Sequence, residues 1–131
     1  MEHPLRELIY GLIEHDLEDT YYIRIELSKK KIPKRKLEKL ERLAEKELSK
    51  TVDSILKEIL EETTKYGGTA SDAYRLLMWE LTGEKIEDFE ETEKKLGTKT
   101  CEKLATEILT IYKDLSTDWI DSLYQRANLP L

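Results

Sequence analysis

The stretch of residues 34–66 constrains the fold most, because it is typical of one long amphipathic helix. Its apolar side chains recur in steps of three or four residues, which is the period of one helix face. These side chains are Leu37, Leu40, Ala44, Leu48, Val52, Ile55 and Ile59, with Leu43, Leu56 and Leu60 at the edges of the stripe. At about 1.5 Å per residue the helix spans roughly 48 Å, so we expect other helices to pack along it.

Two further long helices flank this one in the sequence. The first is expected over residues 4–30, because Pro4 suits the first turn of a helix and apolar side chains follow at helical steps. The second is expected over residues 99–127. Its apolar stripe comprises Cys101, Leu104 or Ala105, Ile108, Tyr112, Leu115, Trp119 and Leu123. Short breaks between long helices favour antiparallel neighbours.

Glycines divide the middle of the chain into two short helices, at about 70–82 and 85–96. Thr69 and Asp72 have the spacing of a capping box at the start of the first. The sequence therefore predicts an all-α, single-domain protein over residues 1–131. The expected architecture is an antiparallel bundle of three long helices and two short ones.

Two local patterns leave alternatives open. Residues 23–27 alternate between apolar and charged side chains, as a strand would, although a helix is the favoured interpretation. Residues 61–71 and 90–100 share the pattern E-E-T-x-K-x-x-G-T-x-[ST], which could indicate a duplicated unit. The favoured explanation is that each segment ends one helix and starts another, which Gly-Thr does well.

The amino-acid composition indicates what kind of protein this is. The chain has 131 residues and a net charge of −6, with a single Gln, a single Asn and abundant Lys and Glu. Such a bias is typical of thermophile proteins. The lone Cys101 cannot form an internal disulfide, and no apolar run approaches the ~20 residues of a membrane span. We therefore expect a soluble cytoplasmic protein without a signal peptide or a membrane partner.

The most unusual segment is basic and joins the first two long helices. Six of the eight residues from 29 to 36 are Lys or Arg in an acidic chain. Cations at the start of a helix oppose its dipole, and free N–H groups there already attract anions. The sequence thus predicts a site for nucleic acid, another polyanion or an acidic protein surface, formed by Lys30, Lys31, Lys34, Arg35 and Lys36. The alternative is a solvated turn, which is the usual role of a charge run.

The first helix also carries apolar side chains outside its main stripe. Leu8, Tyr22 and Ile25 fall on other faces, which predicts an interface, and a homodimer through it is one expectation.

Acidic groups give a weaker signal for a metal site. His15 and Asp19 lie one turn apart but on the side expected to face solvent. An E-x-x-E-E spacing occurs at residues 58–62 and again at 87–91, and it suggests a magnesium-dependent all-α nucleotide hydrolase. No further acidic pair completes that site, so an ordinary charged surface is the favoured interpretation. We assign no catalytic residue, no metal ligand and no cofactor.

These observations favour a non-enzymatic helical binding or assembly protein that contacts a polyanion through the basic turn. The magnesium-dependent hydrolase is one alternative, and a protein–protein adaptor or oligomer subunit is another. A helix-turn-helix regulator is disfavoured, because its would-be recognition helix over 85–95 is acidic and DNA phosphates would repel it.

Overall fold

The computed structural model describes residues 3–28 and 33–126, and their side chains apart from those of residues 18–28 and 37. The described residues contain no strand, which confirms the all-α prediction, and the backbone of residues 23–27 is helical. The helices are α1 (Pro4–Ser28), α2 (Lys34–Lys65), α3 (Ala70–Thr82), α4 (Phe89–Leu96) and α5 (Thr98–Arg126).

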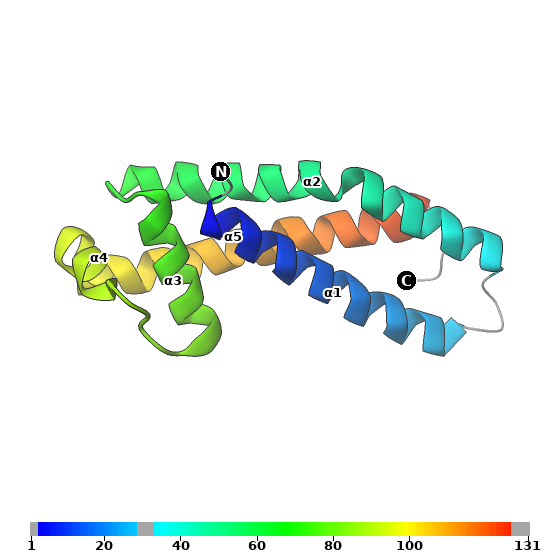
Figure 1. The fold of residues 1–131 in the computed structure, drawn as a ribbon, viewed down its shortest axis with the longest axis horizontal. Helices are drawn as coiled ribbons and strands as arrows, with labels where there is room; N and C mark the ends of the chain where they lie inside the picture. Colours follow the sequence, from blue (N-terminus) through cyan, green and yellow to red (C-terminus); the bar gives the residue numbers. More distant parts are fainter. Residues whose placement is uncertain (1–2, 29–32, 127–131) are drawn as a thin grey trace.

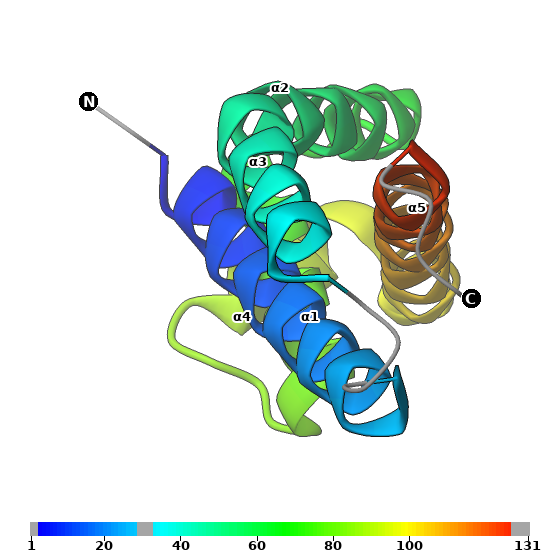
Figure 2. The same ribbon diagram turned by 90° about the vertical axis from the view of Figure 1, so that its right-hand side faces the viewer.

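The three long helices run antiparallel in chain order, as expected. Figure 1 shows α2 returning along α1, and α5 running back along α2. Viewed from the end where α2 begins, α1 and α5 both lie against α2 (Figure 2). At the other end, α3 crosses the bundle and packs on α1, α2 and α5, while α4 lies on α3 and α5. The long helix α2 is therefore the element along which the bundle is assembled.

The turn between α2 and α3 follows from its sequence. Gly67 takes a left-handed conformation with φ of 84°, where a side chain would be strained. Gly68 passes close to α2, because a Cβ there would lie 2.8 Å from Thr63 Cγ2. Thr69 and Asp72 form the predicted capping box, in which each side chain accepts a hydrogen bond from the other's backbone N–H.

The core forms two clusters along α2. The larger lies beside α3 and contains the fully buried side chains of Ile9, Ile55, Leu76 and Ile108. The smaller lies nearer the start of α2 and contains Leu40, Ala44, Ile120, Leu123 and Tyr124. The predicted stripe of α2 is buried from Leu40 to Ile59. Amphipathic spacing alone thus identified which face of α2 is covered.

Two features differ from expectation, namely the residue at which α4 begins and the face of α5 that is buried. Helix α4 begins at Phe89 rather than near residue 85, because Asp88 adopts a left-handed φ of 64° that interrupts helical geometry. In α5 the residues Ser116 and Ile120 are buried, while Leu115 and Trp119 are only half-buried. Steps of four residues from Ile108 to Tyr124 advance by about 40° each on a helix of about 3.6 residues per turn, so the buried face rotates along α5, whereas the predicted stripe stays on one side. Trp119 consequently lies at the rim of the core.

Candidate functional site

The start of α2 carries the described part of the predicted anion site. Lys34 and Arg35 are exposed and Lys36 is half-buried, whereas Lys30 and Lys31 lie outside the described residues. Pro33 precedes the helix without a side-chain cap, and its first turn contains no acidic residue. The first turn of α2 therefore contains no acidic side chain that could offset the positive charge of Lys34 and Arg35.

Beyond this turn, α2 presents a longer row of cations, which we call the basic stripe. Its members recur in steps of four, three, four and four residues, so they share one face at about 100° per residue. All of them are exposed: Arg35, Lys39, Arg42, Lys46 and Lys50. From first to last the stripe extends about 22 Å along the helix axis.

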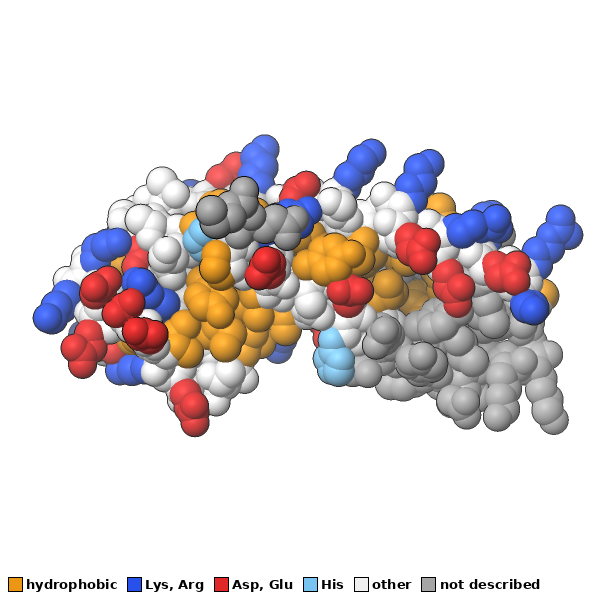
Figure 3. All heavy atoms as spheres, viewed as in Figure 1, with side chains coloured by type: hydrophobic (Ala, Val, Ile, Leu, Met, Phe, Trp, Pro, Cys, Tyr) orange, Lys and Arg blue, Asp and Glu red, His pale blue; other side chains and the backbone are white. Residues whose placement is uncertain are grey.

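The basic stripe is separated from the carboxylates of the same helix. Glu38, Glu41 and Glu45 are exposed on a neighbouring face. Figure 3 shows Lys and Arg side chains rising in a row along α2, with a row of carboxylates below them. Residues 34–50 contain seven cations and four carboxylates, a local charge of +3 in a chain of −6. The stripe is thus a local basic region on an acidic protein.

No ion pair neutralises the basic stripe in the part of the chain that the structure describes. None of its five side chains lies within ion-pair distance of a carboxylate there. The next positions along α2 differ, because Asp53 is bound by Arg6 at 2.9 Å and Lys57 pairs with Glu61 at 4.0 Å. The stripe therefore ends at Lys50.

A cleft of about 520 Å³ between α2 and α5 adjoins the end of the basic stripe. Its lining residues are Lys46, Glu47, Lys50, Thr51, Ser54, Ile55, Leu115 and Trp119. Two stripe lysines thus share a cleft with a half-buried indole that is contributed by another helix. This combination of cations, hydroxyls and an aromatic wall is suited to an aromatic anion.

The carboxylate on the cleft wall, Glu47, is neutralised from α5. Arg126 donates hydrogen bonds to both Glu47 oxygens, and Trp119 Nε1 donates a third at 3.3 Å. The hydrogen bonds from Arg126 lower the pKa of Glu47 to about 2, and the bond from Trp119 acts in the same direction. Glu47 therefore fixes the indole without leaving an unpaired negative charge in the cleft.

A second polar cluster, around Asp72, is buried and structural. The Asp72 carboxylate is fully buried and accepts hydrogen bonds from Thr92 Oγ1 at 2.6 Å and from Lys95 Nζ at 2.8 Å. Burial by itself would raise the pKa of Asp72. The donors, with the backbone N–H of Thr69 among them, outweigh burial and lower the pKa to about 2. This carboxylate joins the start of α3 to α4 and lines none of the clefts formed by the described residues.

The acidic candidates for metal binding do not converge. Glu58 and Glu61 are exposed, and Glu62 pairs with Lys65 at 3.1 Å. In the described part of the chain, no group of three or more His, Cys, Asp or Glu side chains could hold a metal ion. Cys101 is buried, and burial raises the pKa of its thiol, which disfavours the reactive thiolate.

Of the predicted interface residues, only Leu8 has a described side chain. It is half-buried and packs against the main core cluster of its own chain. The side chains of Tyr22 and Ile25 lie outside the described residues.

The sequence contained the signal for the basic stripe, but not for the cleft. The stripe's spacing can be read along residues 35–50, although the denser run at residues 29–36 is more conspicuous. The meeting of Trp119 with Lys46 and Lys50 depends on how α5 packs against α2, which no local pattern encodes.

Comparisons with protein-family models, with curated proteins and with solved structures found no match in any of the three. Among the described helices, none is both long enough and apolar enough to cross a membrane.

Proposed function

We propose that this chain is a non-enzymatic helical binding protein whose basic stripe contacts the phosphates of a nucleic acid. The observation that carries the proposal is the regular, exposed row from Arg35 to Lys50, whose cations form no ion pair with any described carboxylate. A row of this kind neutralises phosphates and releases their counterions, which drives binding without reading the sequence. Lys34 and Lys36 extend the same positive region at the start of α2.

The side chains of the stripe favour contacts with the phosphate backbone of a nucleic acid over contacts with its bases. Three of the stripe's five cations are lysines, which interact with phosphates as mobile point charges. Sequence-specific readout relies on a recognition element that enters a groove, whereas the stripe is a side of a helix packed in a bundle. We therefore expect sequence-independent binding, with a dissociation constant between about 1 and 100 µM at physiological salt.

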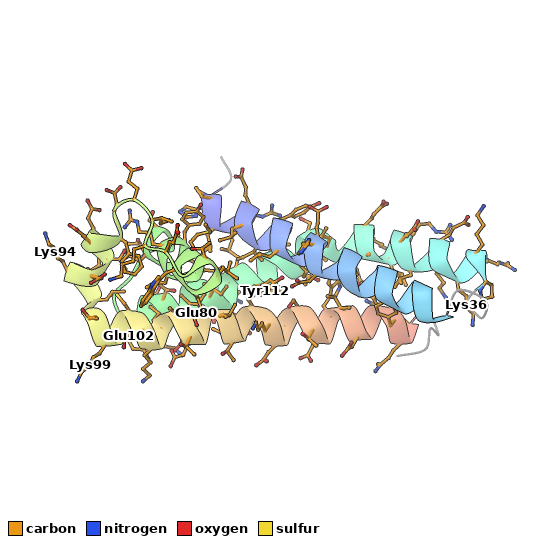
Figure 4. The ribbon with its side chains drawn as sticks, turned by 90° about the horizontal axis from the view of Figure 1, so that it is seen from below. Lys36, Glu80, Lys94, Lys99, Glu102 and Tyr112 are labelled. Carbon is orange, nitrogen blue, oxygen red and sulfur yellow. The ribbon has the colours of Figure 1, made fainter. Side chains whose placement is uncertain are left out.

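A matched pair of double variants tests this function. Lys39→Gln/Arg42→Gln removes two charges from the stripe, and Lys94→Gln/Lys99→Gln removes two from the opposite end of the molecule. Figure 4 shows Lys94 and Lys99 far from Lys36, which marks the start of α2. Both variants have the same net charge, so they separate a local site from a general effect of charge.

The measurement is the anisotropy of labelled single-stranded and duplex oligonucleotides at low salt. The stripe variant is expected to bind about tenfold more weakly. The control variant is expected to bind within about twofold of the unmodified protein, because Lys94 and Lys99 lie at the opposite end of the molecule from the start of α2. Equal losses in the two variants, or no binding by the unmodified protein, would refute the proposal.

A further inference from the structure

The cleft between α2 and α5 offers more than positive charge. Lys46 and Lys50 belong to the basic stripe, while Leu115 and Trp119 provide an apolar wall from α5. Two other described clefts also place lysines beside apolar side chains, but each is lined by at least two carboxylates. One is lined by Asp53, Leu56, Lys57, Leu60, Glu61, Thr64 and Lys65. The other, at the start of α4, is lined by Lys85, Ile86, Asp88, Phe89, Glu90, Glu91 and Lys94. Neither cleft is lined by a tryptophan together with two lysines that form no ion pair with a described carboxylate.

We propose that this cleft receives a base of a single-stranded nucleic acid against Trp119, while Lys46 and Lys50 contact the adjoining phosphates. The inference rests on the proposed function, because it names the form of nucleic acid that the basic stripe binds. A base within a duplex is stacked on its neighbours and cannot enter a cleft beside the backbone, whereas a single strand can turn one base outward.

The surroundings of Trp119 suit a stacking partner. The indole is half-buried, and its N–H is already bonded to Glu47, so its position is held while part of its surface stays accessible. Thr51 and Ser54 place hydroxyls on the α2 side of the cleft. Ser54 donates its own proton to Lys50 O at 3.1 Å, and its oxygen can still accept from a base.

Electrostatics in the cleft do not oppose a phosphate. The one carboxylate that lines it, Glu47, forms two hydrogen bonds with Arg126. The volume of about 520 Å³ lies within the range of small-molecule sites. Because every base has a π-face, stacking on Trp119 does not depend on the nucleotide sequence. Contacts with phosphates do not depend on it either, so the two kinds of contact are consistent.

Tryptophan fluorescence gives a direct test. The chain has two tryptophans, so Trp79→Phe leaves Trp119 as the only source of indole emission. The ligands are a short oligothymidylate, an oligouridylate of equal length, the same DNA strand with abasic sites, a duplex and inorganic polyphosphate. We expect both base-carrying single strands to quench Trp119, and the abasic strand, duplex and polyphosphate to bind without quenching.

The second measurement is the binding affinity for each ligand. Removal of the bases, with the phosphates unchanged, is expected to weaken binding about tenfold. Trp119→Leu should cause a similar loss for the single strands and change duplex binding by less than about twofold. Because Trp119 also packs on the core, Ser54→Met provides a second variant, in which a longer side chain on an exposed helix position covers the cleft. Ser54→Met should weaken the binding of the base-carrying single strands only.

The outcomes separate the two proposals. If no polyanion binds, the proposed function fails and this inference fails with it. If duplex, polyphosphate and abasic strand bind as tightly as the base-carrying strands, without quenching of Trp119, the basic stripe stands and the base site is refuted.

Discussion

Trp119 Nε1 donates a hydrogen bond to Glu47 Oε2 at 3.3 Å and so joins α5 to α2 across 72 residues of sequence. Arg126, two turns further along α5, binds the same carboxylate. One acidic side chain therefore orients both the indole of the cleft and the last described turn of α5. Any change at Glu47 should affect the cleft and the stability of this helix pair together.

Glu47→Gln is expected to lower the free energy of unfolding by about 1 kcal/mol, a value discounted because Arg126 is 41% exposed. The amide retains one acceptor but loses the charge that binds the guanidinium. The loss should shrink in high salt, which screens the pair in the unmodified protein. Urea unfolding at two salt concentrations measures it. Glu45→Gln is the neighbouring control, with an expected change within about 0.5 kcal/mol.

Asp72→Asn should be more costly, by about 2 kcal/mol, because a buried amide cannot accept from Thr69, Thr92 and Lys95 as the carboxylate does. The pKa of Asp72 is lowered from 3.8 to about 2 in the folded protein. Its contribution to stability is thus complete above pH 3.8 and disappears as the pH falls towards 2.

Thermal unfolding of the unmodified protein and Asp72→Asn between pH 2 and pH 7 checks this prediction. The two stabilities should converge at the acidic end. A difference that stays constant over the whole range would show that the ionised carboxylate is not the stabilising group.

Local features of the sequence predicted most of the fold. The capping box of Thr69 and Asp72 joins residues three apart, so its geometry follows from the helix start itself. The buried face of α2 follows from periodicity in the same way. By contrast, the residues before Phe89 resemble a helix in composition, and only the left-handed Asp88 delays α4.

The cleft could not be predicted because it depends on the pairing of distant faces. Periodicity placed Trp119 on the buried stripe of α5, but the buried face rotates along this helix, so Ile120 is buried and the indole lies at the edge. Which lysines of α2 would lie opposite that edge depends on the axial register of two long helices. The sequence of either helix alone does not determine this register.

Tyr112 joins α5 to α1, since its hydroxyl donates a hydrogen bond to Asp16 Oδ2 at 2.5 Å (labelled in Figure 4). Tyr112→Phe removes the donor but keeps the ring in the core. We expect a loss of about 1 kcal/mol in the free energy of unfolding, because half-buried Asp16 can still recruit water. Tyr10→Phe, at another half-buried tyrosine, is the control and should change stability by less than about 0.5 kcal/mol.

Two glycines should respond to alanine in opposite directions. Gly11 lies within α1, and an added Cβ there would meet no atom within 4 Å, so Gly11→Ala should stabilise the protein by about 0.5–1 kcal/mol. Gly68→Ala would bring the new methyl within 2.8 Å of Thr63 Cγ2 and should destabilise it by about 1–3 kcal/mol. Paired melting curves test the sign of each effect, and a stabilised Gly68→Ala would contradict the described turn.

The salt dependence of binding to a short single-stranded oligonucleotide tests directly whether the basic stripe contacts phosphates. If all five stripe cations contact phosphates, the logarithm of the association constant should fall against the logarithm of salt concentration with a slope of about −3.5. Lys39→Gln/Arg42→Gln should reduce the slope to about −2.1, and Lys94→Gln/Lys99→Gln should leave it unchanged. A slope near zero in the unmodified protein, or one that the stripe variant does not change, would contradict a phosphate-binding role for the face of α2.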